Sequence, residues 1–207
     1  MKLDLDPFPH RLAFVRAHAT LRAGCAFMIR HAGDRAGAEH GLPAFAHSRL
    51  VGNRLRELDR FLSVLIEEGC RCLGDARHDA RAFARLRNTP YKLRLLEAML
   101  GRPSGDKARL RAIGRVGACL CHCAGTIRRP GLGEDVRLAG GAVGADAIPA
   151  EACARLDLPP RAIRSISDFY RTIGDRLLVA ALRRPPRLDF PAPEAHLTRA
   201  NVACDGI

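Results

Sequence analysis

The stretch that decides the fold is residues 48–72, SRLVGNRLRELDRFLSVLIEEGCRC. Its apolar and small residues recur at alternating intervals of four and three residues, at Val51, Leu55, Leu58, Leu62, Leu65, Gly69 and Cys72. This spacing places all seven on one side of an α-helix, as the narrow apolar seam that packs in helical bundles and coiled coils. The arginines and glutamates between them take the solvated side. The stretch therefore predicts a long amphipathic helix.

Further helices are predicted on both sides of this stretch. Apolar residues at helical spacing, together with glycine and proline breaks, place them at residues 8–37, 75–87, 90–100, 104–128, 149–156 and 160–183. The composition favours the same class, because hydrophobic residues reach 47% while aromatic residues make up only 5% and Trp is absent. We therefore expect an all-α fold, a helical bundle of about six or seven helices.

The predicted helices are organised as one domain over residues 1–183. The remaining residues, 184–207, contain four prolines and are expected to form an extended or disordered tail. The glycine-rich residues 129–147 are expected to form a loop. Two alternatives for this loop are a domain sub-boundary and a short hairpin around Val136 and Val143.

The charge of the chain is strongly positive and unevenly distributed. Its 34 Lys and Arg outnumber 22 Asp and Glu, which gives a net charge of +12. Residues 71–130 alone carry fourteen basic against four acidic residues. Clustered cations favour phosphate-bearing partners, although an arginine excess also follows from a GC-rich genome. The phosphate contacts predicted in this region are Arg85, Arg87, Lys92, Arg94 and Arg111.

One segment near the C-terminus has the pattern of a DNA-binding motif. Residues 149–171 read PAEACARLDLPPRAIRSISDFYR and resemble a helix-turn-helix, with Asp157 where the motif usually has Gly. The apolar residues that would hold the two helices across each other are Ala152, Leu156, Leu158, Ile163 and Ile166. The resemblance implies that the second helix enters the major groove of DNA. Its exposed early residues would be Arg161, Arg164, Ser165 and Asp168, and of these Arg161, Arg164 and Ser165 would contact DNA.

A second motif suggests catalysis instead. Arg115 and His122 are seven residues apart on one predicted helix, so they project from nearly the same face. Such a pair could hold a phosphate and supply a general acid or base. The spacing resembles that of HEPN-type helical ribonucleases. This resemblance implies a metal-independent endoribonuclease that works as a dimer, with Arg115 and His122 as its catalytic residues.

The cysteine cluster does not predict a metal site. Cys119, Cys121 and Cys123 alternate around a helix, so they cannot all reach one ion. No glycine motif for nucleotide binding is present. We therefore expect neither a metal nor another cofactor.

The expected location is the cytoplasm, without a membrane partner. The acidic start of the chain does not resemble a signal peptide, and no stretch approaches 18 consecutive apolar residues. The leading expectation is a nucleic-acid-binding protein rather than an enzyme, with DNA ahead of RNA. A ribonuclease is one alternative. The other is a helical protein-interaction module, and the seam at residues 51–72 would form a homodimer.

Overall fold

The fold is a bundle of α-helices, as the sequence predicts. The computed structural model describes residues 7–33, 43–73, 80–86, 88–129, 131–140, 156 and 158–183, and these contain seven helices and no strand. The helices are α1 (Pro7–Gly33), α2 (Ala44–Leu73), α3 (Ala80–Arg85), α4 (Thr89–Met99), α5 (Lys107–His122), α6 (Leu132–Gly140) and α7 (Pro160–Leu182).

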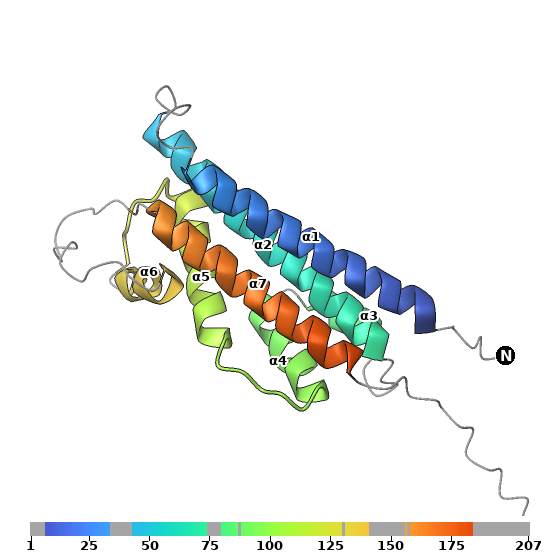
Figure 1. Cartoon of the computed structure of the whole chain (residues 1–207). Helices are drawn as coiled ribbons and strands as arrows, with labels where there is room; N and C mark the ends of the chain where they lie inside the picture. The colour runs from blue at the N-terminus through green and yellow to red at the C-terminus, as the bar shows by residue number, and fades with distance from the viewer. Residues whose placement is uncertain are drawn as a thin grey trace, which may run out of the picture.

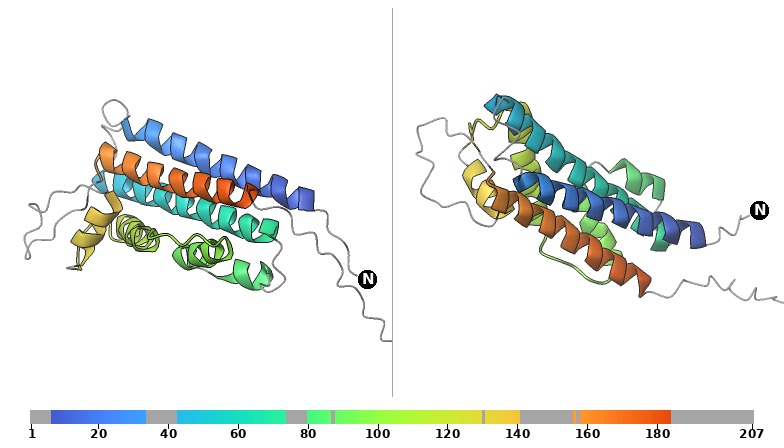
Figure 2. Two further views of the ribbon diagram at one scale, coloured as in Figure 1. Left: turned by 60° about the horizontal axis from the view of Figure 1, so that its bottom comes forward. Right: turned by 45° about the horizontal axis from the view of Figure 1, so that its top comes forward.

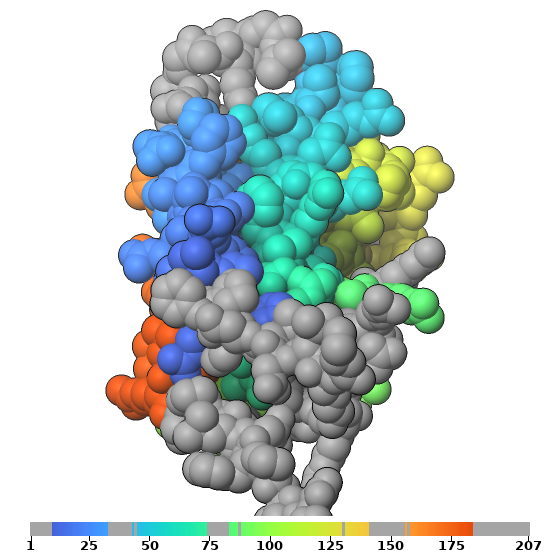
Figure 3. Space-filling view, turned by 90° about the vertical axis from the view of Figure 1, so that its right-hand side faces the viewer, coloured from blue at the N-terminus to red at the C-terminus, as the bar shows by residue number. Residues whose placement is uncertain are grey.

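The three longest helices lie side by side along the molecule. Figure 1 shows α1 running antiparallel to α2 and α7. Helix α2 is central, since it contacts α1 and α7 on one side and α3, α4 and α5 on the other. The left view in Figure 2 shows α4, α5 and α6 on one side of the three long helices. In the space-filling view of Figure 3, α1 lies between α7 and α2, so α1 covers one side of the bundle.

The apolar seam of α2 lies in the core of this bundle. Val51, Leu55, Leu58, Leu62 and Leu65 are each exposed by at most 4%. They belong to one hydrophobic cluster with buried residues of α1, α5 and α7. Burial of such side chains is the main favourable contribution to folding. Because the seam is used within the chain, a homodimer would have to use another face of α2.

Helix α1 combines a core position with an apolar composition. Its segment His10–Ala32 has a mean hydropathy of 1.2 and, by length and composition alone, could cross a membrane. The segment still contains no run of 18 consecutive apolar residues, because Arg11, Arg16, Arg22 and Arg30 interrupt it. A core helix passes the same test, and α1 buries Phe14, Leu21, Cys25 and Met28 against the rest of the bundle.

Residues 132–140 correct one prediction of the sequence analysis. They form α6, so the expected loop with a hairpin around Val136 is wrong there, and Val143 lies outside the described residues. Leu132, Val136 and Ala139 recur at helical spacing and are buried. This apolar face packs against α5. Tertiary packing thus outweighs the local helix-breaking tendency of glycine.

Helix α5 ends six residues earlier than expected, at His122. Ala124 and Gly125 follow with positive φ angles of 50° and 80°. The Gly125 amide donates to the Cys119 carbonyl, as in helix ends that are closed by a left-handed residue. The chain then turns away and leads into α6.

Two glycines lie in opposite surroundings and give a test of the packing. A Cβ added at Gly52 in α2 would lie 2.7 Å from Cys121 Sγ and 2.8 Å from the Cys121 amide nitrogen, whereas one added at Gly114 in α5 would meet nothing within 4 Å. We expect Gly52→Ala to lower the free energy of unfolding by about 1–3 kcal/mol. Gly114→Ala should raise it by about 0.5–1 kcal/mol, because alanine is the better helix former. Urea unfolding measures both, and equal effects would contradict the described contact.

Candidate nucleic-acid interface

The outer side of α5 is the centre of the candidate site. The residues Arg111, Gly114, Arg115, Ala118 and His122 recur at helical spacing and are all exposed. We call them the α5 face. The apolar residues of α5 lie on its other side and are buried in the core. The same helical period that fixes α5 in the bundle therefore presents two arginines and a histidine to solvent.

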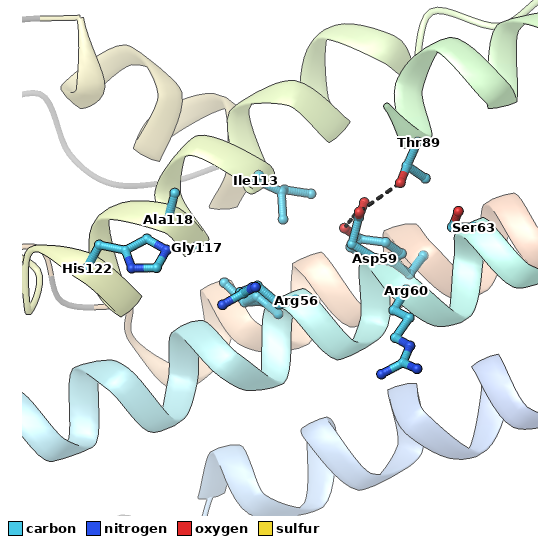
Figure 4. A pocket seen from close by; sticks show the side chains of 12 residues that line it. Arg56, Asp59, Arg60, Ser63, Thr89, Ile113, Gly117, Ala118 and His122 are labelled. Atoms are coloured by element: carbon cyan, nitrogen blue, oxygen red, sulfur yellow. Dashed lines mark hydrogen bonds between the residues drawn. The ribbon is translucent and has the colours of Figure 1, made fainter. Parts of the chain in front are cut away.

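A cavity of about 380 Å³ lies between α2 and α5, and we call it the α2–α5 pocket. Arg56 and Arg60 of α2 and His122 of α5 line it, together with Asp59, Ser63, Thr89 and Tyr170. Figure 4 shows Asp59 and Thr89 on one side of the pocket and Gly117, Ala118 and His122 on the other. Its volume is within the range of about 300–1,000 Å³ that is usual for ligand sites.

Asp59 is the acidic group of this pocket. The Thr89 hydroxyl donates to Asp59 Oδ2 at 2.7 Å, and the Tyr170 hydroxyl lies 3.5 Å from Oδ1. Burial raises the pKa of Asp59, and hydrogen bonds from Thr89 and Tyr170 and the charge of Lys92 oppose this effect. Burial also raises the pKa of Tyr170, which keeps this hydroxyl a donor at neutral pH. The carboxylate is thus fixed in position but poorly solvated.

A second cavity, of about 780 Å³, lies on the other side of α5. This α5–α6 pocket is lined by Arg115, Ala118, Cys119, His122, Cys123, Thr126, Arg128, Arg129, Gly131, Leu132, Glu134 and Asp135. Ala118 and His122 line both pockets, so the α5 face forms the wall between them. The two residues that the sequence paired, Arg115 and His122, therefore border the same cavity.

Asp135 fixes the orientation of Arg115. The Arg115 Nε donates to Asp135 Oδ2 at 2.6 Å, and a second bond joins Nη2 to Oδ1. This hydrogen bonding raises the pKa of Arg115. The Arg115 side chain stays 56% exposed while that of Asp135 is only 12% exposed. The guanidinium is thus held in place at the surface by a nearly buried acid.

The first turns of α7 form a third, more open hollow of about 550 Å³, the α7 hollow. Arg161 and Arg164 line it and are exposed, as predicted for contacts to DNA. Arg109 of α5 also lines it, with its guanidinium 4.4 Å from the centroid of the Phe169 ring. The Ser165 hydroxyl accepts a hydrogen bond from Arg109 at 2.8 Å. Ser165 therefore orients Arg109 within the protein.

Lys92 was predicted to contact phosphate, and the structure contradicts this prediction. Its side chain is only 4% exposed, and its ammonium pairs with Glu67 of α2 and donates to Ser63 Oγ at 3.0 Å. The reason is its position on the side of α4 that packs against α2. A lysine buried in such a pair is not available to an external phosphate. Lys92 holds α4 on α2 instead.

The other predicted basic residues divide between several surfaces. Arg111 is on the α5 face, whereas Arg85 and Arg94 are exposed on α3 and α4. The Arg94 guanidinium lies 4.9 Å from the centroid of the Tyr91 ring. Arg87 lies outside the described residues. Of the predicted contacts in residues 71–130, only Arg111 therefore belongs to the α5 face.

The helix-turn-helix resemblance is only partly within the described residues. Residues 149–155 and Asp157 lie outside them, so the first helix and the turn remain predictions. Leu156 and Leu158 are buried, and the Leu156 amide donates to the Gly125 carbonyl at 2.6 Å. Helix α7 then packs along its length against α1 and α2.

Sequence reasoning missed the four arginines that flank the α5 face, Arg56, Arg60, Arg128 and Arg129, and it missed Asp59. The arginines follow no motif, and only the fold brings residues 56–60 of α2 beside α5. The sequence gives no signal for Asp59, because charged residues also stand directly beside other seam residues, as Arg54 and Arg56 do beside Leu55.

The cysteines of α5 point to separate partners. Cys119 Sγ lies 3.4 Å from the Thr126 carbonyl oxygen, and Cys121 Sγ lies 3.4 Å from Asn53 Oδ1. Across the described part of the chain, no three His, Cys, Asp or Glu side chains are grouped so that they could hold a metal ion. Cys119 and Cys121 act here as small packing residues.

Comparison with known proteins identifies no relative of this chain. The chain matches no protein-family model, no curated protein and no solved structure.

Proposed function

We propose that the protein binds nucleic acid and that the phosphate backbone lies across the α5 face. The observation that carries the proposal is the position of Arg115 and His122 on the rim of one cavity, with His122 also bordering the other. Cations from two further segments flank this face: Arg56, Arg60, Arg128 and Arg129. Positive charge from three segments of the chain thus gathers around one helix.

These arginines suit phosphate binding because most of them form no ion pair with an acidic residue of the protein. Within the described part of the chain, Arg56, Arg128 and Arg129 form no ion pair with an acid. An arginine can bind a phosphate through two parallel hydrogen bonds. Each phosphate that is neutralised releases counterions from the nucleic acid, so binding weakens as salt rises.

The proposal extends to duplex DNA through α7. Arg161 and Arg164 occupy the first turns of the helix that resembles a recognition helix, and both are exposed. Arginine is the side chain that most often reads guanine in the major groove. Base contacts from these two residues would add sequence preference to the phosphate contacts.

The phosphate contacts can be tested with a pair of matched double variants. We expect Arg128→Ala with Arg129→Ala to weaken binding about tenfold, to a similar extent for all sequences, and to lower the slope of log affinity against log salt by about 1–2. Binding of labelled duplex DNA and of single-stranded RNA is measured by fluorescence anisotropy across a salt series. Arg16→Ala with Arg30→Ala, on exposed positions of α1, removes the same charge away from the α5 face.

The α1 double variant decides whether location matters or only net charge. It should keep nearly the affinity and salt slope of the wild type. Equal losses in both double variants would indicate a nonspecific effect of composition. Absence of binding by the wild type, even at low salt, would contradict the proposal and favour the protein-interaction module.

Base reading by α7 has a separate test. We expect Arg161→Ala and Arg164→Ala each to reduce discrimination among duplex DNA sequences by about 1–3 kcal/mol at the position that the side chain reads. The measurement is selection from a random duplex library, followed by affinities for selected and scrambled sites. Uniform weakening on both sites would show that these arginines contact only phosphate.

A second candidate function is cleavage of RNA without a metal. Arg115 and His122 line one cavity, and Asp135 holds the Arg115 guanidinium at its edge. In this reaction the RNA 2′-oxygen forms a bond to the neighbouring phosphorus while the bond to the 5′-oxygen breaks. His122 would transfer the proton and Arg115 would stabilise the phosphoryl charge. The products are a 2′,3′-cyclic phosphate and a 5′-hydroxyl end.

The cleavage candidate predicts a chelator-resistant activity that depends on His122. We expect His122→Ala to lower the rate of RNA cleavage by about 100-fold or more, since general acid–base catalysis contributes about 10²–10⁴. Cleavage is followed with labelled RNA in excess EDTA, with end-group analysis of the products. His31→Ala, a histidine of α1, is the matched control and should leave the rate unchanged. An activity that survives His122→Ala belongs to a contaminant or another site.

A further inference from the structure

We propose that the α2–α5 pocket receives one unpaired base of the bound strand, and that the Asp59 carboxylate accepts a hydrogen bond from an amino group on the edge of that base. The inference rests on the proposed function, because the cations around the pocket would hold the adjoining phosphates. It predicts a preference for adenine, cytosine or guanine over uracil and thymine, which carry no exocyclic amino group.

The first step is the way in which α2 and α5 separate. At Gly52 an added Cβ would meet Cys121 Sγ at 2.7 Å. Figure 4 shows α5 close to α2 at His122 and farther from α2 toward the start of α5, and the pocket lies between the two helices.

The second step is that packing does not explain Gly114. Gly24, Gly52 and Gly174 each lie where an added Cβ would come within 3.0 Å of a neighbour, so close packing requires them. Gly114 has no such neighbour, yet a glycine inside a helix costs about 1 kcal/mol relative to alanine. Because it lines the pocket, its missing side chain leaves one wall flat and open. A planar base fits against a wall of this kind.

The third step is the chemistry of Asp59. A carboxylate accepts about four hydrogen bonds in all, and the Thr89 and Tyr170 hydroxyls occupy part of that capacity. Its charge repels phosphate but attracts N–H donors, so an acid among phosphate-binding arginines favours a base edge in the pocket. Where proteins recognise bases, Asp and Glu carboxylates accept a hydrogen bond from the amino group of cytosine. Arg56 and His122 on the same pocket remain for the flanking phosphates.

The experiment compares labelled RNA oligomers of about ten nucleotides that contain only cytosine or only uracil. Affinities of the full chain are measured by fluorescence anisotropy at one salt concentration. We expect the wild type to bind oligo-C about tenfold more tightly than oligo-U, as one hydrogen bond to a charged group provides. Gly114→Leu fills the pocket and should remove this preference, so that the variant binds oligo-C and oligo-U equally.

Asp59→Asn provides an independent variant of nearly the same shape. It removes the charge and should lower the preference to about twofold or less, with oligo-U bound as well as or better than by the wild type. Asp175→Asn is the matched control, because Asp175 pairs with His18 between α1 and α7, away from the pocket. It should keep the tenfold preference. Thermal unfolding confirms that each variant is folded.

The possible failures are distinguishable. Equal, salt-sensitive binding of oligo-C and oligo-U by the wild type would overturn the base pocket and leave the proposed nucleic-acid binding intact. A tenfold preference for oligo-C that survives in folded Gly114→Leu or in folded Asp59→Asn would also overturn it. No binding of either oligomer by the wild type would overturn both proposals.

Discussion

The close approach of α2 and α5 is the constraint on which the rest of the structure depends. Their backbones come so near at Gly52 that no side chain fits between α2 and Cys121. Helix α2 is meanwhile held on its other side by the core that it shares with α1 and α7. Straight helices that touch at one point and cross at an angle must separate beyond it. A cavity that begins beside this contact is therefore a consequence of the packing.

The same constraint determines which residues α5 presents to solvent. Its inner residues are committed to the core, so the opposite side is exposed by helical geometry. That side carries Arg111, Arg115 and His122 with small residues between them. The turn after α5 adds Arg128 and Arg129, and Asp135 of α6 fixes Arg115. An exposed cationic surface thus arises from positions that contribute little to folding, where charge is free to vary.

The sequence predicted the helices well and the site poorly, for one physical reason. Helical period and breakers are local, so the seam of α2 was evident and the start of α4 was predicted to within one residue, at Pro90 where the structure has Thr89 with Asn88 as its N-cap. Contacts between residues that are far apart in the sequence leave no such local pattern. Lys92 was expected to face solvent because nothing nearby in the sequence indicates Glu67, and α6 was missed because its glycines mask an apolar face that only α5 explains. The cavity between α2 and α5 likewise has no signature in either helix alone.

Asp59 joins the fold to the candidate site. Through Thr89 it links α2 to the first turn of α4, and through Tyr170 to the buried side of α7. A carboxylate used only as a tether would be better placed where water solvates its remaining lone pairs, because burial raises its pKa and makes the charged form costly. Asp59 instead faces a cavity with an arginine rim. Arginines attract every phosphate equally, whereas a carboxylate repels phosphate and attracts N–H donors, and among the residues that line this pocket Asp59 is the carboxylate.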